Sequence, residues 1–76
     1  MIKKLSALRS GESGTIASIE LSDLHIKLME MGCIPGENIK VQQVAPFGDP
    51  ITVKVAGYHL SLRLSEASQI LVDTEN

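Results

Sequence analysis

The side chains best suited to bind a metal ion lie close together, next to a glycine-containing corner. His25, Met29 and Cys33 follow one another at intervals of four residues, so a continuous helix would align an imidazole, a thioether and a thiol on one side. Gly32 interrupts this series, because glycine often ends a helix in the left-handed conformation, which would turn Cys33 away. Ferrous iron also prefers imidazole and carboxylate to thioether ligands. We therefore expect Met29 and Cys33 to be packing residues, and we expect neither a metal site nor a bound cofactor.

The rest of the chain offers little for catalysis. The sequence has no GxSxG nucleophile motif, no phosphate-binding glycine loop and no Cys–His pair at a motif spacing. Its carboxylates are not paired in an apolar setting, as they are where one acts as a general acid and the other as a base. We predict that the protein is not an enzyme.

The charge balance argues against nucleic acid as a partner. Seven Lys and Arg residues against nine Asp and Glu residues give a net charge of −2, whereas phosphate binding needs a basic face. An RNA-binding barrel would also need aromatic residues for stacking, and the sequence has one tyrosine, one phenylalanine and no tryptophan. We expect no nucleic acid partner.

Cysteine content and hydropathy indicate the compartment. The single cysteine excludes an internal disulfide and fits a reducing environment. The basic start, Met1 to Lys4, is not followed by the apolar run of a signal peptide, and no window approaches the roughly 18 apolar residues of a membrane span. We expect a cytoplasmic protein that does not insert into the membrane, with residues 1–76 forming a single domain.

The residues around the corner predict how it is built. Gly32 suits the position just after a helix, and Pro35 cannot continue one. Pro35-Gly36 has the chemistry of a type II turn, which would direct the chain into a strand. Upstream, Ser22 or Asp23 would cap the helix. The helix would bury one stripe, with Ile34 following it inward at the corner; the stripe is Leu24, Leu28 and Met31.

The same helix has a second apolar side. Ile26 and Met29 lie opposite the buried stripe, so that side must be covered by the chain itself or by a partner. The segment from Leu5 to Leu8, or the C-terminal turn, would serve as an internal cover. Arg63 is expected to point outward from a strand, where it would either pair with Glu66 or contact a partner through its planar fork. Our candidate partner-binding residues are therefore Ile26, Met29 and Arg63.

Strand patterns fill most of the remaining sequence. Five segments have strand composition or alternation: residues 15–20, 39–45, 51–55, 58–64 and 69–72. The third and fourth segments predict a set of inward-facing side chains, comprising Val53, Val55, Tyr58, Leu60, Leu62 and Leu64. Ser65 would cap one helical turn, and residues 73–76 would form a frayed polar tail. Short strands bury their edges best by curling into a barrel. We predict a mainly β fold, a small SH3-like barrel of about five strands with one short helix between strands one and two.

Three segments together resemble a known family. Lys27–Gly36 (KLMEMGCIPG), Val44–Ile51 (VAPFGDPI) and Leu60–Arg63 (LSLR) are similar in order and spacing to ferrous iron transport protein A, FeoA. The resemblance runs from about Leu5 to Val72. It implies an SH3-like barrel and a cytosolic accessory role in ferrous iron uptake. It also implies a partner, the GTPase-containing ferrous iron transporter of the FeoB type, through which the protein would lie at the inner membrane.

The resemblance also leaves a second function open. The family includes SH3-like domains fused to the transporter and to iron-dependent repressors, so a regulatory domain of the metal-dependent repressor kind is the alternative. A repressor needs a DNA-binding domain, and no helix-turn-helix fits this sequence. The sequence ends close to where the domain ends, so we expect a stand-alone protein.

Overall fold

The computed structural model describes residues 1–74, which form a small curved sheet with short helices. The strands are β1 (Ile2–Lys4), β2 (Ser13–Ile19), β3 (Asn38–Val44), β4 (Ile51–Val55), β5 (Tyr58–Leu62) and β6 (Ile70–Asp73). The helices are a 3-10 helix (Leu5–Ala7), α1 (His25–Glu30) and α2 (Leu64–Ala67). Neither α1 nor α2 is long and apolar enough to cross a membrane, and no other helix within residues 1–74 is.

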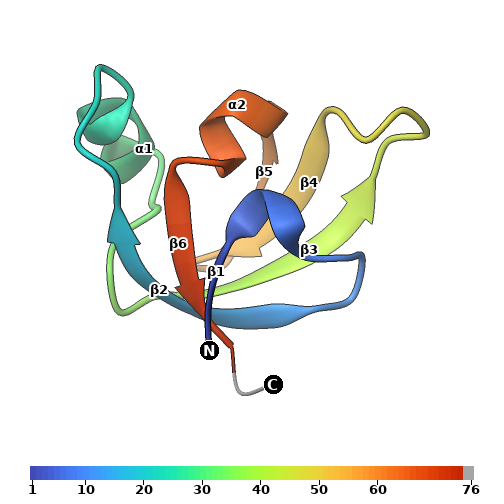
Figure 1. The fold of residues 1–76 in the computed structure, drawn as a ribbon, viewed down its shortest axis with the longest axis horizontal. Coiled ribbons are helices and arrows are strands. Elements are labelled where there is room, and N and C mark those ends of the chain that lie inside the picture. The colour runs from blue at the N-terminus through green and yellow to red at the C-terminus, as the bar shows by residue number, and fades with distance from the viewer. Residues whose placement is uncertain (75–76) are drawn as a thin grey trace.

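The sheet confirms the predicted mainly β, SH3-like fold and adds one strand. Within residues 1–74 the strands pair antiparallel in the order β1-β6-β2-β3-β4-β5 (Figure 1). The predicted helix is α1, and it connects β2 to β3, the first two strands of the prediction. The register shifts between Ile16 and Ser18 on β2 and between Val41 and Gln43 on β3. Such irregularities increase strand bending, which helps a small sheet to curl.

A single apolar cluster fills the concave side of the sheet. Figure 1 shows α1, α2 and the 3-10 helix lying along the open side of the curved sheet. The buried side chains are Leu5, Leu8, Ile16, Ile19, Leu28, Cys33, Ile39, Val41, Ile51, Val53, Val55, Leu62, Ala67, Ile70 and Val72. This core is aliphatic, so its stability comes from the burial of branched side chains. Gly14 lets β2 approach β6 closely, because a Cβ there would lie 2.6 Å from the carbonyl oxygen of Asp73.

The prediction of inward-facing side chains is right on β4 and in the middle of β5, but it is wrong at the two ends of the segment around β5. Val53, Val55 and Leu62 are at most 1% exposed, and Leu60 packs against the core while partly exposed. Tyr58 is 68% exposed, because it sits beside the β4–β5 turn at the end of the sheet. Leu64 is 40% exposed, because the chain has already left β5 and begun α2 there. The strand period therefore predicts burial along the middle of β5 but not at its first residue or beyond its last one.

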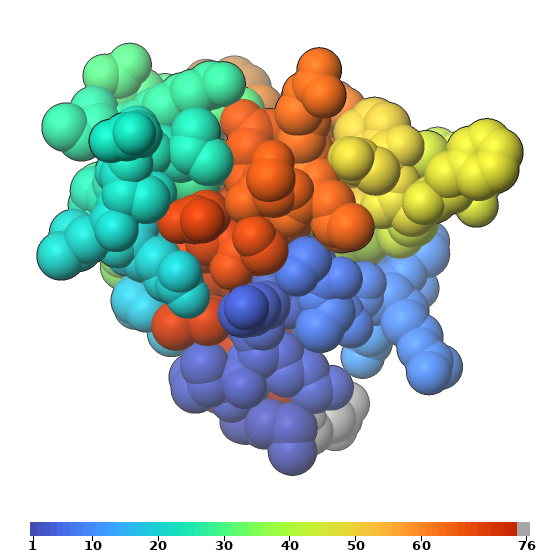
Figure 2. Space-filling view, turned by 45° about the horizontal axis from the view of Figure 1, so that its top comes forward, coloured from blue at the N-terminus to red at the C-terminus, as the bar shows by residue number. Residues whose placement is uncertain are grey.

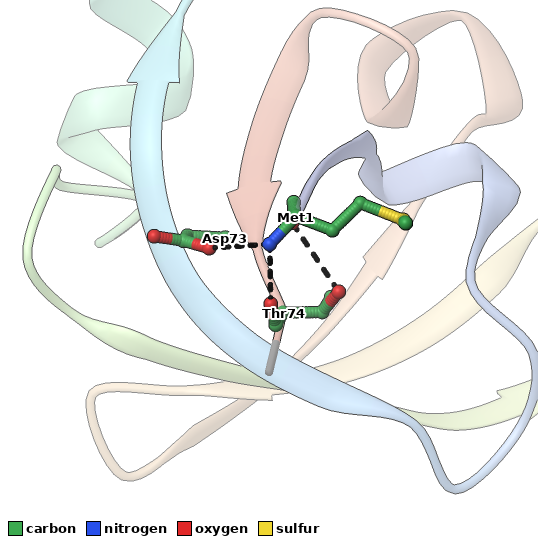
Figure 3. A network of polar contacts seen from close by, with 3 residues as sticks. All are labelled: Met1, Asp73 and Thr74. Carbon is green, nitrogen blue, oxygen red and sulfur yellow. Dashed lines mark hydrogen bonds and ion pairs between the residues drawn. The ribbon is translucent and has the colours of Figure 1, made fainter. Parts of the chain in front are cut away.

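The two ends of the described chain are joined, which the sequence did not predict. Strand β1 pairs with β6, and the N–H of Thr74 donates to the carbonyl of Met1 at 2.8 Å. The ammonium group of Met1 reaches Asp73 Oδ1 at 3.1 Å and the Thr74 carbonyl at 2.7 Å (Figure 3). Asp73 therefore ends β6 and Thr74 is buried, so neither belongs to a frayed tail. The rest of that predicted tail, residues 75 and 76, lies outside the described residues.

Candidate functional site

Helix α1 ends where the sequence indicated, but it does not begin there: its N-cap is Leu24, which makes no side-chain capping hydrogen bond, so the predicted cap by Ser22 or Asp23 is wrong. The Leu24 N–H donates to Ser22 Oγ at 3.2 Å, just before the first turn. At the other end Gly32 has a φ of +103°. The Cys33 N–H donates to the Leu28 carbonyl at 3.0 Å and the Gly32 N–H to the Met29 carbonyl at 3.0 Å. These two bonds form a Schellman motif, which explains why glycine is needed at this position.

The end of α1 separates the three possible metal ligands. Cys33 is fully buried beside Leu28, as the packing prediction required, whereas Met29 is 37% exposed on the outside of the helix. Burial, reinforced by the nearby Glu66 charge, raises the pKa of the Cys33 thiol, which keeps it protonated. Among the residues that the structure describes, no three His, Cys, Asp or Glu side chains converge in a way that could hold a metal ion.

The outer side of α1 is uncovered in the described chain. Ile26 is 67% exposed, and Met29 lies one turn further along the same short helix. The proposed internal cover lies elsewhere, because Leu5 and Leu8 join the core and the 3-10 helix contacts α2 and β6. The prediction that Ile34 follows the helix inward is wrong, because it is 43% exposed at the corner. Ile26, Met29 and Ile34 therefore lie exposed on α1 and the corner that follows it.

Arg63 stands at the N-cap of α2, where it is tied to a buried carboxylate. The Arg63 N–H donates to Glu66 Oε1 at 2.8 Å, and Glu66 Oε2 pairs with Lys27 Nζ at 3.2 Å. Glu66 is only 8% exposed. The backbone bond from Arg63 lowers the pKa of this carboxyl against the opposing effect of burial, and Lys27 lowers it further. The predicted surface pairing of the Arg63 side chain with Glu66 is wrong: Glu66 is buried and pairs with Lys27, and Arg63 bonds to it through its backbone N–H from beyond the end of β5.

A cleft of about 540 Å³ lies between α1, the β3–β4 loop and the start of α2. Its charged lining comprises Lys27, Asp49, Arg63 and Glu66, and its other lining residues are Leu24, Pro50, Ser61 and Ser65. Asp49 Oδ1 accepts the Leu64 N–H at 2.9 Å, which fixes the loop against α2. Figure 2 shows the surfaces of α1 (green) and α2 (orange) next to one another. The structure thus places Arg63 in the cleft, whereas Ile26 and Met29 do not line it.

Sequence reasoning named Glu66 only as a possible surface partner of Arg63 and missed its two structural roles, at the start of α2 and toward Lys27. Glu66 follows Arg63 by three positions, the spacing of a glutamate that reaches back to the N-cap backbone. We placed the cap at Ser65 because serine is the commoner capping residue. The pairing of Glu66 with Lys27 joins residues that are far apart in the sequence, and no local pattern indicates it.

Comparisons with known proteins agree with the fold and the resemblance. A family model described as the FeoA domain matches residues 3–74. A curated relative from Porphyromonas gingivalis, an Fe(2+) transport protein A/Fe(2+) transporter FeoB fusion protein, is 35% identical over 71 residues. The match covers 92% of this chain but only 8% of the fusion protein's length.

Solved structures match over nearly the whole chain. The NMR structure of a FeoA-like protein from Clostridium acetobutylicum has a TM-score of 0.92 at 34% identity, covering 99% of this chain and 88% of that one. A Stenotrophomonas maltophilia FeoA complexed with zinc, described as a prokaryotic SH3 domain protein, has a TM-score of 0.81 at 30% identity, covering 93% and 89%. A manganese-dependent transcriptional repressor matches with a TM-score of 0.88 at 25% identity, covering 96% of this chain and 36% of the repressor.

Proposed function

Because the chain belongs to the FeoA domain family, we propose that it is an accessory protein of ferrous iron uptake that binds the GTPase-containing region of a FeoB-type transporter. The family is linked to ferrous iron transport and consists of small accessory or regulatory domains. In this proposal the protein works in the cytoplasm, at the inner membrane through its partner, and acts by contact and not by catalysis.

The observation that carries the proposal is the fusion protein. In that relative a FeoA unit similar to this chain and a FeoB transporter share one polypeptide. A covalent link holds two modules at an effective concentration in the millimolar range. When the two proteins are separate chains, no link holds them together. The small protein then needs a surface that binds the transporter with enough affinity of its own.

The exposed side of α1 is the surface that we assign to this contact. Ile26 and Met29 lie uncovered on a helix whose opposite side is anchored in the core by Leu28. Burying apolar area contributes about 25 cal/mol per Å², and methionine adapts its shape to different partners. The patch is small, which suits a weak and transient contact. Arg63 is exposed in the cleft that Lys27 also lines, and it would add a charged contact at the edge of this surface.

The test is binding to the purified cytosolic GTPase region of the FeoB-type transporter from the same organism. The double variant Ile26→Glu/Met29→Glu introduces two charges into the assigned surface and should abolish binding in biolayer interferometry. The matched control is Leu21→Glu/Phe47→Glu, because these side chains are 90% and 99% exposed and lie outside α1. The control should bind as the wild type does.

Two outcomes would contradict the assignment. If both double variants bind normally, the contact lies elsewhere, and Arg63→Glu then tests the cleft. If the wild type shows no binding in either nucleotide state of the GTPase region, the proposed partner is wrong.

The similarity to a manganese-dependent repressor favours one alternative, a regulatory domain that contacts another domain of a metal-dependent repressor. The match covers 36% of that repressor, so the shared part is one unit of a larger protein. The two functions separate in cells, because deletion of an accessory protein should reduce ferrous iron uptake without changing transcription of the uptake genes. A change in transcription at constant transporter activity would favour the alternative.

A further inference from the structure

Strand β5 forms one edge of the sheet and has an unpaired side. In the described residues the strand order ends at β5, whose ladder partner is β4. An edge strand presents a row of backbone N–H and C=O groups that another strand can pair with. In several kinds of recognition domain, an extended peptide pairs with these backbone groups and adds a strand to the sheet.

The turn geometry shows which backbone groups face that edge. Ala56 and Gly57, the two residues between β4 and β5, have φ values of +52° and +83°. Positive φ at both positions is the mark of a two-residue type I′ hairpin, in which the flanking residues, here Val55 and Tyr58, exchange hydrogen bonds. Bonded and non-bonded pairs alternate along an antiparallel ladder. The N–H and C=O groups of His59 and Ser61 therefore point away from β4, toward the open edge.

A row of basic side chains crosses the sheet to the same edge. Lys40 on β3 is directly opposite Lys54 on β4, and Lys54 is directly opposite His59 on β5. All three are exposed. Like charges directly opposite one another destabilise a sheet. Neither lysine takes part in an ion pair within residues 1–74. The two lysines therefore lie side by side with no ion-pair partner in the described chain.

The outward positions that flank the row on β3, β4 and β5 carry no acidic side chain; they are Asn38, Gln43, Thr52 and Ser61. Asp73 lies on the same face further away, on β6 opposite Thr15, and pairs with the ammonium group of Met1. The protein as a whole is acidic, with a net charge of −2. The positive charge on this face is thus a local feature and not a consequence of the overall composition.

Space for a further strand exists beside the second half of β5. Ser61 and Arg63 line the 540 Å³ cleft, and Leu24 and Lys27 of the α1 region line it on the other side. The cleft also holds two carboxylates that already have partners: Asp49 accepts the Leu64 N–H, and Glu66 accepts the Arg63 N–H and pairs with Lys27. A chain running along the β5 edge would pass between these two walls. Its residues would meet the outward side chains of β5 on one face and Leu24 on the other.

We propose that the β5 edge binds an extended acidic segment of a partner protein as an additional antiparallel strand. The backbone of the segment would pair with His59 and Ser61. Alternate carboxylates of the segment would lie opposite these residues, where they continue the row His59–Lys54–Lys40 and approach Arg63. This site is distinct from the outer side of α1 and does not depend on the identity of the partner assigned there.

The geometry favours a strand over an anionic membrane or a nucleic acid. Lipid headgroups and phosphates would be attracted by the lysine row, but they would leave the edge N–H and C=O groups unpaired. A row of three basic residues is also short for phosphate binding, which usually involves a larger basic face. A segment with alternating acidic residues satisfies both the charges and the open backbone, because alternate side chains of a strand share one face.

The probe is the acetylated and amidated peptide Thr-Glu-Val-Glu-Val-Glu-Val-Thr, titrated into the isotope-labelled full chain at low salt. We expect saturable amide shifts centred on His59 and Ser61, with slower hydrogen exchange at both amides. The same peptide N-methylated at its glutamates should not bind, because the glutamates opposite His59 and Ser61 must donate their N–H groups to β5. A peptide with lysine in place of glutamate should also fail to bind.

Protein variants locate the charge contribution. Lys54→Glu should weaken binding of the acidic probe about tenfold, a change of about 1.4 kcal/mol. Lys4→Glu is the matched control, because it makes the same charge change on β1, at the opposite edge of the sheet, and should leave the affinity unchanged.

Three results would overturn the proposal. One is equal binding of the N-methylated probe, which would show attraction by charge alone. Another is binding of the acidic probe with shifts confined to α1. The third is no binding of the acidic probe together with tight, Lys54-dependent binding to vesicles containing phosphatidylserine, which would assign the basic row to a membrane surface.

Discussion

Lys27 Nζ lies 3.2 Å from Glu66 Oε2 and joins α1 to α2 across the surface of the molecule. The other oxygen of the same carboxylate accepts the Arg63 N–H at 2.8 Å. A single buried side chain therefore fixes the start of α2 and contacts the helix that carries Ile26 and Met29. The carboxylate of Glu66 therefore contacts both candidate surfaces, α1 through Lys27 and the cleft through the Arg63 backbone.

Removing the charge of Glu66 should destabilise the fold near neutral pH. A hydrogen bond to a charged group contributes about 1.5–3 kcal/mol, whereas the contact with the 61% exposed Lys27 adds little. We expect Glu66→Gln to lower the free energy of unfolding by about 1–3 kcal/mol. Urea denaturation followed by circular dichroism measures this difference, and Glu20→Gln, at an exposed position, is the control.

The same substitution predicts a pH dependence. The pKa of Glu66 is lowered in the folded state from an ordinary value of 4.5. A lowered pKa stabilises the fold above the unfolded-state pKa, and this contribution is lost as the pH falls through the folded-state pKa. The difference between the wild type and Glu66→Gln should therefore be full near pH 7 and shrink below about pH 4.5. A difference that stays constant down to strongly acidic pH would contradict this explanation.

Cys33 should react very slowly with thiol reagents in the folded protein. Its side chain is fully buried, and its pKa is raised by burial and by the Glu66 charge. The reagent therefore cannot reach the sulfur atom, and little of the reactive thiolate form is present. Labelling with Ellman's reagent should be slow in buffer and fast in urea. A Cys33→Ala/Ser18→Cys variant, with its thiol at an exposed position on β2, should react quickly in both. Fast labelling of wild-type Cys33 in buffer would place that residue outside the core.

Much of the fold follows from local patterns in the sequence. The alternation in residues 51–55 predicted β4 with its observed bounds, and Gly32 predicted the end of α1. Strand β1 was missed because it has three residues, too few for a period of two to be visible, and it exists through its pairing with β6. Leu64 was placed inward because alternation does not show where a strand ends, and Tyr58 because alternation does not show that a paired residue at the edge of the sheet can lack cover.

The site was less predictable than the fold. The apolar excess on α1 could be read from helical spacing, and it correctly left Ile26 and Met29 on the outer side. The cleft and the Lys27–Glu66 contact join segments separated by the whole β3–β5 region. The basic row from Lys40 to His59 depends on strand register, which hydrophobic pattern and turn type set together. Such features become visible only once the sheet is assembled.

Truncating Leu62 should severely destabilise the protein. Leu62 is fully buried at the end of β5, opposite Ile51. We expect Leu62→Ala to cost about 2–5 kcal/mol, the usual range for a core leucine, which is a large part of the stability of a domain of this size. Tyr58→Ala on the same strand should stay within about 0.5 kcal/mol, because its side chain is largely exposed. Urea denaturation of both variants tests the assignment, and similar losses for the two would contradict it.

The final prediction separates the outer side of α1 from the core side. Ile26→Glu/Met29→Glu changes side chains that are 67% and 37% exposed, so Ile26 loses little buried area and Met29 loses only its partly buried portion. A glutamate at position 26 lies in the first turn, where the helix dipole favours it, and one at position 29 lies in the last turn, where the dipole opposes it. These effects largely cancel, and we expect a loss of less than about 1 kcal/mol. Leu28→Ala, between them in sequence but fully buried, should cost about 2–5 kcal/mol. Thermal melts of the two variants make the comparison.

If the double glutamate variant unfolds, both side chains belong to the core and the proposed interface on α1 is wrong. If it keeps its melting temperature and loses the transporter contact, the outer side of α1 is a binding surface.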